Sequence, residues 1–168
     1  MNYINRFISS LKGPRLGPSP QIRVFIQKYG NNNIVFMNVC REPIQEYILK
    51  AANLITLGGF NKKKIELNYD KLFHLYLLIS LENNVNFKLE KNEIVQIKPI
   101  SEFIHKDCMT INVPINEKIS FSNFLNNGIK SQGMNFWLYD AIVNNCQRFV
   151  NTLLKSNNLG NEKIYFFC

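Results

Sequence analysis

The chain has 168 residues, which suits one domain of ordinary size. Hydrophobic residues make up 46% of it, and Gly and Pro number only 8 and 6, which excludes a disordered, collagen-like or low-complexity chain. The formal net charge of +8 is compatible with a nucleic acid partner but does not require one. No apolar run approaches the roughly 18 residues of a membrane-spanning helix, and we recognise no secretory signal. We therefore expect a protein that is not secreted and has no transmembrane segment.

In the first half of the chain we expect an arm, a hairpin and a helix. Residues 1–20 end in a Gly/Pro cluster that is typical of an N-terminal arm. Ile22–Tyr29 and Ile34–Val39 are predicted to be strands, joined by an asparagine turn into a hairpin. Pro43 is well placed to begin a helix, which the Gly58-Gly59 pair would end.

A second hairpin is predicted next. Leu72–Leu81 is strongly apolar, as in a buried strand, and Val85–Ile97 alternates after a turn at Asn83-Asn84. Further along, we predict a short strand at Thr110–Val113 and a short helix at Phe121–Leu125, capped by Ser120 or Ser122. A longer helix at Asn145–Leu154 and a final strand at Ile164–Phe167 follow. This mixture indicates a single α+β domain over residues 21–168.

The cysteines are scattered rather than clustered: Cys40, Cys108, Cys146 and Cys168. Because zinc sites place Cys and His at short, regular spacings, we expect no metal, and nothing in the sequence indicates a cofactor. A disulfide framework is not expected in a chain of this size without a secretory signal. Each cysteine is then either a small buried hydrophobe or a reactive thiol.

Of these thiols, Cys146 is the best placed for activation. It follows Asn144-Asn145 and opens a predicted helix, where free backbone N–H groups and the helix dipole stabilise a thiolate. The same N–H groups can bind a developing oxyanion. The alternative interpretation is an ordinary buried cysteine in an amphipathic helix.

A cysteine nucleophile needs an imidazole partner, and the chain has only His74 and His105. His105 lies between charged residues in a predicted loop, so we expect it at the surface. His74 lies near the start of the apolar strand predicted above. A lone histidine on a strand is more often structural, so its catalytic role depends on its pairing with Cys146.

The stretch around Cys146 resembles the nucleophile helix of the circularly permuted papain-like enzymes. These comprise the NlpC/P60 peptidases, the lecithin:retinol acyltransferase-like proteins and the PPPDE peptidases. The residues that carry the resemblance are Tyr139, Asn145-Cys146-Gln147, Phe149-Val150 and Leu153. The acyltransferase-like members have a Tyr at this spacing before Asn-Cys-Glu-His-Phe-Val, and their catalytic His begins an upstream strand, as His74 does here. FHLYL and LEKNEI also resemble segments of cysteine proteases of virophages and large DNA viruses.

The resemblance covers roughly residues 73–154 and carries expectations about fold and mechanism. It implies a circularly permuted papain-like domain, in which an antiparallel sheet packs against the helix that bears the nucleophile. The catalytic core would span about residues 70–155. Cys146 would form an acyl-enzyme, with His74 as general base and then general acid.

The residue that orients His74 stays open between three candidates. Gln147-Arg148 replaces the Glu-His that follows the nucleophile in the acyltransferases, and their second strand histidine is absent. Alignment by strand pattern favours Glu90. A two-residue turn at Asn83-Asn84 instead places Glu93 opposite His74, and a change of one residue in loop length brings Asn92 there. For all three, the alternative interpretation is a solvated strand face.

Four other residues receive narrower predictions. The backbone N–H of Cys146 is the expected first oxyanion donor, and Asn144 or Tyr139 is a candidate for the second. Trp137 is expected to pack against the wall of the active site. Arg41 is a charge between two apolar stretches, for which pairing with an acid at the rim of the core is one interpretation.

We therefore expect a cysteine protease. The viral resemblance implies a structural precursor, such as a capsid protein, as the substrate, virion maturation as the role, and the virion or host cytoplasm as the location; without it, a cytoplasmic location is expected. One alternative is an acyltransferase or lipid hydrolase that uses the same nucleophile. Another is a non-enzymatic basic module that binds nucleic acid, in which His74 and Cys146 are core residues.

Overall fold

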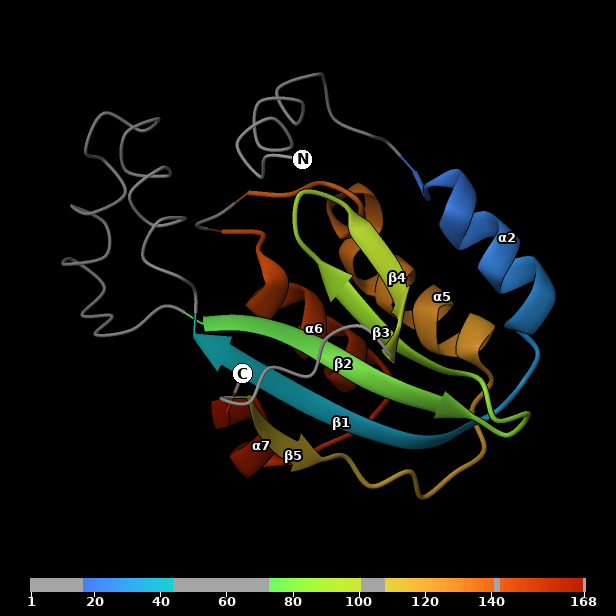
Figure 1. The fold of residues 1–168 in the computed structure, drawn as a ribbon. Coiled ribbons are helices and arrows are strands. Elements are labelled where there is room, and N and C mark those ends of the chain that lie inside the picture. The colour runs from blue at the N-terminus through green and yellow to red at the C-terminus, as the bar shows by residue number, and fades with distance from the viewer. Residues whose placement is uncertain (1–16, 44–72, 101–107, 141–142, 168) are drawn as a thin grey trace, which may run out of the picture.

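The computed structural model describes residues 17–43, 73–100, 108–140 and 143–167. These residues form an α+β structure with a five-stranded sheet in the order β4-β3-β2-β1-β5, in which all neighbouring strands are antiparallel (Figure 1). The predicted α+β class is thus confirmed. The expected arm up to residue 16, the helix expected after Pro43, His105 and Cys168 lie outside the described residues.

The strands are β1 (Ile34–Pro43), β2 (Phe73–Leu81), β3 (Asn86–Lys91), β4 (Val95–Pro99) and β5 (Met109–Asn112). The helices are α2 (Pro20–Tyr29), α5 (Phe121–Gln132), the 3₁₀ helix η2 (Gly133–Phe136), α6 (Cys146–Ser156) and α7 (Glu162–Phe167). None of the helices in these segments is long and apolar enough to cross a membrane.

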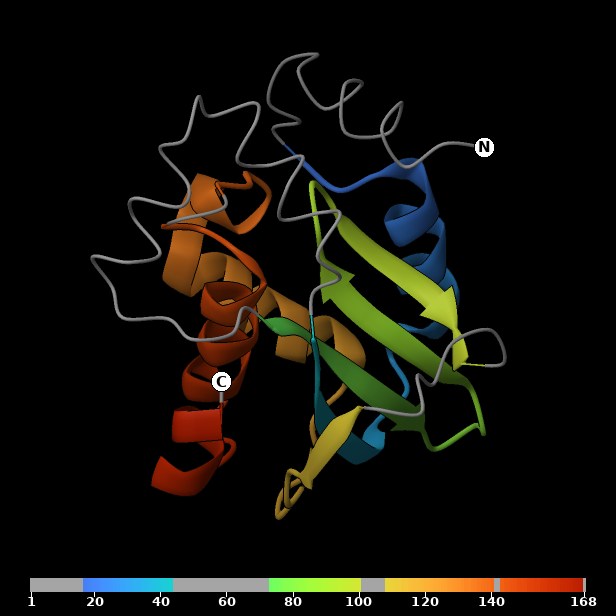
Figure 2. The same cartoon turned by 60° about the vertical axis from the view of Figure 1, so that its left-hand side comes forward.

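The main core lies between the sheet and the helices α5 and α6, which cover one of its faces (Figure 2). Alternate residues of β2 point toward this core, because side chains of a strand alternate between its two faces. Leu75, Leu77 and Ile79 belong to this core, whereas Tyr76 and Leu78 are buried in a smaller cluster with Cys40. β2 is therefore buried on both faces, as its nearly continuous apolar run predicts.

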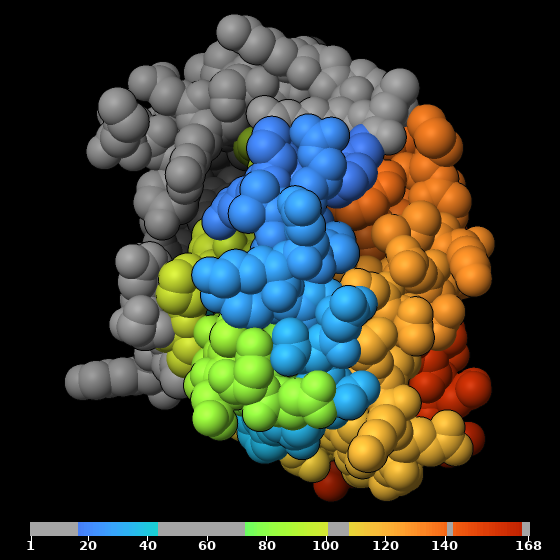
Figure 3. All heavy atoms as spheres, turned by 90° about the vertical axis from the view of Figure 1, so that its right-hand side faces the viewer, coloured from blue at the N-terminus to red at the C-terminus, as the bar shows by residue number. Residues whose placement is uncertain are grey.

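α2 extends the helical layer toward β4. Its Phe25 ring meets the rings of Phe87 and Phe121 at centroid distances of 4.7 and 5.7 Å, in edge-on contacts. In the space-filling view, α2 lies between the β2–β3 hairpin and the α5 region (Figure 3). Gln21 Nε2 also donates to the Ile97 carbonyl at 3.0 Å, which covers part of the exposed edge of β4.

The prediction of a strand over Ile22–Tyr29 is wrong, because this segment belongs to α2. Ser19 caps the helix through its hydroxyl, which accepts from the Ile22 N–H, and Pro20 occupies the first turn. These end signals outweigh the weak alternation of the segment. β1 consequently pairs with β2 and β5 instead of forming the predicted first hairpin. Pro43, which was expected to begin a helix, ends β1 and pairs with Phe73.

Two further strand predictions need correction. Val85–Ile97 is not one strand, since a turn over residues 92–94 divides it into β3 and β4. The predicted final strand is the helix α7, whose first turn is tied by a hydrogen bond from the Ile164 N–H to Asn161 Oδ1. The strand near Thr110–Val113, the helix that begins at Phe121 and the helix near Asn145–Leu154 are confirmed, with Ser120 as the cap of α5.

The loop between β2 and β3 is longer than a two-residue turn. The Leu81 N–H donates to the Val85 carbonyl at 2.9 Å, so residues 82–84 form the loop, and Asn84 adopts a positive φ of 63°. Asn tolerates this left-handed conformation better than most residues. The ladder therefore pairs Tyr76 with Glu90, a register that decides which carboxylate reaches His74.

Candidate active site

The candidate nucleophile Cys146 is the first residue of α6. The Asn145 side chain caps this helix by accepting from the backbone N–H groups of Gln147 and Arg148, at 3.1 and 3.2 Å. The Cys146 side chain is 7% exposed, and its Sγ lies 4.0 Å from the Phe73 carbonyl oxygen at the start of β2. The N-terminus of α6 thus lies against the first residues of β2, the strand that carries His74.

His74 and the Cys146 side chain each shift the pKa of the other, so two residues that are far apart in sequence lie close together in the fold. On its other side, His74 Nε2 lies 2.9 Å from Glu90 Oε2. Because Nε2 is engaged by the carboxylate, Nδ1 is the ring nitrogen left to exchange a proton with the thiol. Thiol, imidazole and carboxylate therefore form a connected series from α6 through β2 to β3.

The environment favours the thiolate–imidazolium state of this pair. Burial raises the pKa of the Cys146 thiol, but the hydrogen bond and charge of His74, together with the backbone N–H groups of Leu75 and Gln147, lower it below its ordinary value. Burial lowers the pKa of His74, but its bonds with Cys146 and Glu90 outweigh that effect and raise the pKa to about 9. Such an ion pair is the form in which a thiol is most nucleophilic near neutral pH.

Glu90 is almost fully buried, at 1% exposed, and lies among cations. Besides His74, its carboxylate pairs with Lys88 Nζ at 2.9 Å and with the Lys98 ammonium. Burial alone would raise the pKa of this carboxyl, but the hydrogen bond from His74 and the charge of Lys88 hold it far below its usual range. Glu90 therefore remains ionised and orients the imidazole through a charge-assisted hydrogen bond.

Glu90 is the one of the three predicted candidates that the structure shows in contact with His74. It pairs with Tyr76, two residues along β2 on the same face as His74, and a long side chain spans this diagonal. Glu93 lies in the β3–β4 turn, where its charge acts on the Tyr139 phenol. Asn92 also lies in that turn, where its backbone N–H donates to the Ile94 carbonyl at 3.2 Å. The register that favoured Glu93 rested on a loop one residue too short.

The two candidate oxyanion donors separate clearly. The Asn144 amide donates to the carbonyls of Asn135 and Leu138, at 2.7 and 2.6 Å, so its N–H groups are committed to the protein backbone. The prediction of Asn144 as a donor to substrate is therefore wrong. Burial raises the pKa of Tyr139, and the negative charges of Cys146, Asp140 and Glu93 raise it further. Tyr139 as a whole is 41% exposed, and its raised pKa means that the hydroxyl keeps its proton.

Lys91 is a site residue that sequence reasoning missed. Its side chain is 0% exposed, and its ammonium donates to the Asn135 carbonyl at 3.0 Å and to Asn144 Oδ1 at 3.3 Å. A lysine in an alternating strand ordinarily indicates a solvated face. The signal that was available is its place beside Glu90, since consecutive strand residues face opposite sides of the sheet.

Two of the other thiols, Cys40 and Cys108, lie among the described residues. Cys40 is buried and Cys108 partly exposed, both in free form, and the Tyr76 hydroxyl lies 3.3 Å from Cys108 Sγ. Trp137 packs against the core and meets the Phe136 ring edge-on, as expected of a structural residue. The Arg41 guanidinium lies 3.6 Å from the centroid of the Phe73 ring, a cation–π contact that the sequence did not predict.

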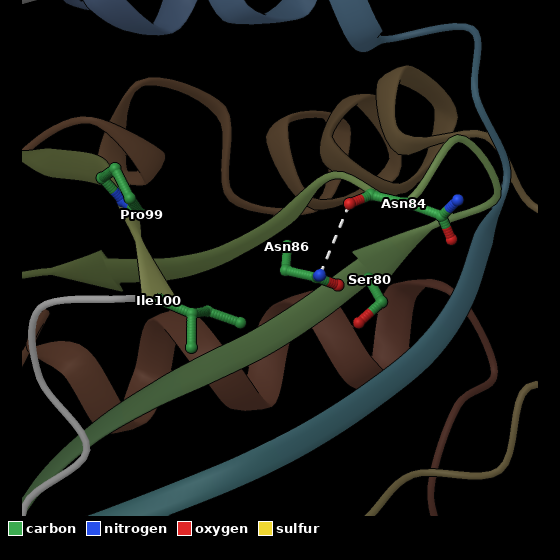
Figure 4. A pocket seen from close by; sticks show the side chains of 5 residues that line it. All are labelled: Ser80, Asn84, Asn86, Pro99 and Ile100. Atoms are coloured by element: carbon green, nitrogen blue, oxygen red, sulfur yellow. Dashed lines mark hydrogen bonds between the residues drawn. The ribbon is translucent and has the colours of Figure 1, made fainter.

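An open hollow of about 530 Å³ lies at the opposite end of β2, lined by Ser80, Asn84, Asn86, Pro99 and Ile100 (Figure 4). Ser80 and Asn86 face each other across the β2–β3 ladder. At about 3.3 Å per residue along a strand, Ser80 is about 20 Å from His74. The hollow is therefore separate from the thiol–imidazole pair.

Among the residues that the structure describes, no group of three or more His, Cys, Asp or Glu side chains is arranged to hold a metal ion. Comparison with known proteins gives no further guide: no family model, no curated protein and no solved structure matches this chain.

Proposed function

We propose that this protein is a cysteine peptidase that cleaves amide bonds through an acyl-enzyme at Cys146. The observation that carries the proposal is the position of His74, whose Nε2 bonds with the buried carboxylate of Glu90 and whose pKa is coupled to that of the Cys146 thiol. A nucleophile, a base and a group that orients the base are the parts that acyl transfer needs.

In the acylation step, the Cys146 thiolate attacks the carbonyl carbon of the substrate and forms a C–S bond. The tetrahedral intermediate then collapses, the C–N bond breaks, and the imidazolium of His74 delivers its proton to the departing amine. Glu90 stays ionised throughout and holds the ring so that Nδ1 faces the sulfur. The product of this step is a thioester and a free amine.

In the deacylation step, His74 is neutral and accepts a proton from a water molecule. The hydroxide attacks the thioester carbonyl, the C–S bond breaks, and the sulfur leaves as a thiolate beside the reprotonated imidazole. The acid product departs and the ion pair is restored, so no external cofactor is consumed.

Two donors support the oxyanion in this proposal. As the first residue of α6, Cys146 has a backbone N–H with no acceptor within the helix. The second is the Tyr139 hydroxyl, whose proton is retained because its pKa is raised by burial and by neighbouring negative charge. Asn144 supplies structural support instead.

For the substrate, the resemblance to virophage and large DNA virus proteases favours a viral structural precursor, processed during virion maturation. The net charge of +8 is compatible with activity near packaged nucleic acid. Both statements rest on sequence, and neither is needed for the chemistry above.

The test is cleavage of a denatured-protein mixture, with new amino termini identified by mass spectrometry. We expect cleavage by the wild type and a loss of at least about 10³-fold for Cys146→Ala, because the nucleophile is removed. Cys108→Ser is the matched control, since it alters a partly exposed thiol outside the site, and we expect it to retain cleavage.

Two outcomes would contradict the proposal. Cleavage by Cys146→Ala at the wild-type rate would exclude Cys146 as the nucleophile. Release of fatty acid from phosphatidylcholine vesicles in a Cys146-dependent manner, with no peptide cleavage, would assign the same residues to lipid acyl chemistry instead.

A further inference from the structure

Lys91 is a fully buried cation beside the nucleophile. It is the last residue of β3 and lies on the face that packs against α6, where its ammonium is 5.8 Å from the centroid of the Phe149 ring. Moving an ammonium out of water is costly unless its hydrogen bonds are replaced. A methionine would fill similar space without the desolvation cost. The role of Lys91 must therefore come from the groups that its ammonium contacts.

Those partners belong to the segment that leads into α6. Lys91 Nζ donates to the Asn135 carbonyl and to Asn144 Oδ1. The Asn144 side-chain amide in turn donates to the carbonyls of Asn135 and Leu138. The ammonium and the amide together hold the end of η2 against the residue that precedes the helix cap. Asp140 and Asn144 also exchange backbone hydrogen bonds, at 3.2 and 3.1 Å, which gives Asn144 a further attachment.

This network ends next to the nucleophile, because Asn144 is followed by the cap Asn145 and then by Cys146. On the other face of β3, the preceding residue Glu90 holds His74. Consecutive residues of one strand therefore support the two members of the ion pair, the imidazole through Glu90 and the thiolate through Lys91.

The charges around Lys91 agree with this arrangement. The pKa of Lys91 is lowered to about 8, chiefly by burial and also by the positive charge of Arg148, while the negative charge of the Cys146 thiolate acts in the opposite direction. The hydrogen-bond acceptors described for its ammonium are a carbonyl and an amide oxygen, both uncharged. The favourable charge interaction of Lys91 is thus with the nucleophile.

We propose that Lys91 is a positioning residue for Cys146: by clamping Asn135 and Asn144, its buried ammonium fixes the entry to α6 so that the thiolate faces His74. This inference rests on the proposed function, in which Cys146 is the nucleophile. It makes β3 the element that aligns both reacting groups, although Lys91 itself touches neither the substrate nor His74.

The experiment compares wild type, Lys91→Met and Lys130→Met. Lys130 is an exposed lysine in the last turn of α5, so the control makes the same chemical change away from the network. Two readouts are taken for each folded protein: the pH midpoint for alkylation of Cys146 by iodoacetamide, followed by peptide mass spectrometry, and the kcat and KM for peptide cleavage.

For Lys91→Met we expect the midpoint to rise by about one pH unit, because the thiolate loses a nearby cation and its fixed position. We expect kcat to fall by about 10²-fold, with KM little changed, as for a misplaced reacting group. Lys130→Met should match the wild type in both. A folded Lys91→Met protein with the wild-type midpoint and kcat would overturn the inference.

Lys91→Arg provides the second variant should Lys91→Met fail to fold, because it keeps the positive charge and the donors. A folded Lys91→Arg protein should keep the wild-type midpoint, and an upward shift of a full unit would contradict the role of the charge. The readouts also separate this inference from the proposed function. If wild type cleaves no peptide but Lys91→Met still raises the midpoint, the peptidase proposal fails and the positioning role stands.

Discussion

At the scale of single residues, the charges around Glu90 determine which residue of the site transfers protons and which one orients the imidazole. His74, Lys88 and Lys98 surround one carboxylate, and Glu42 adds a second negative charge 3.9 Å from Lys88 Nζ. With this many cations nearby, Glu90 stays ionised over the whole working pH range. Proton transfer therefore falls to His74, and the carboxylate serves to orient and charge the ring.

Glu90→Gln tests this role. The substitution removes the negative charge that supports the imidazolium, so the pKa of His74 should fall from about 9, and the alkaline limb of kcat/KM should move to lower pH with it. We expect kcat/KM to fall on the order of 10²-fold. NMR titration of the His74 ring gives the pKa, and a ring that still titrates near 9 would contradict the assignment.

The same substitution should also destabilise the fold, because it leaves buried cations without a counter-charge, at a cost of about 3 kcal/mol. The folded-state pKa of Glu90 is depressed, so its contribution is present above the ordinary value of 4.5 and is lost as the pH falls toward the folded-state pKa. The difference in unfolding free energy between variant and wild type should therefore shrink in acid. Glu162→Gln, at an exposed position of α7, is the control and should leave the unfolding free energy of the wild type unchanged.

At the scale of elements, α6 combines a structural and a chemical function in one turn. The Asn145 side chain begins the helix by accepting from the backbone N–H groups of Gln147 and Arg148, and the Gln147 N–H also lowers the pKa of the Cys146 thiol. This part was predictable, because an Asn before an amphipathic run is a strong helix-start signal. The Ser19-Pro20 pair is a signal of the same kind, but the weak alternation after it led to the wrong prediction for α2.

Asn145→Ala should separate these two functions of the cap. Losing the capping bonds costs about 1 kcal/mol of stability, and the thiol pKa should rise because the cap no longer fixes the Gln147 N–H, which lowers that pKa in the wild type. Ser120→Ala is the matched control, since Ser120 caps α5 in the same way through Asn123. It should cause a similar loss in a urea denaturation and no change in the Cys146 alkylation midpoint. An equal midpoint in Asn145→Ala and wild type would show that the cap does not act on the thiolate.

At the scale of the whole molecule, the site forms where three elements from the two layers meet: β2 and β3 of the sheet, and α6 of the helical layer. Sequence reasoning paired Cys146 with His74 because Cys146 opens a predicted helix and His74 is one of only two histidines, and in the structure each of the two residues shifts the pKa of the other. Sequence was not sufficient to choose between Glu90, Glu93 and Asn92, since that choice depends both on the loop length and on the diagonal reach of Glu90 from its strand partner Tyr76 to His74. For Lys91 the sequence offered only its place beside Glu90, because its burial follows from how α6 packs on β3.

The central claim is that Cys146 and His74 form a reactive ion pair, and the most direct measurement is the rate of Cys146 alkylation by iodoacetamide as a function of pH in wild type and His74→Ala. The account predicts a midpoint well below the ordinary thiol value of 9.0 in the wild type and a large upward shift in His74→Ala. A wild-type midpoint near 9.0 that His74→Ala leaves unchanged would contradict it.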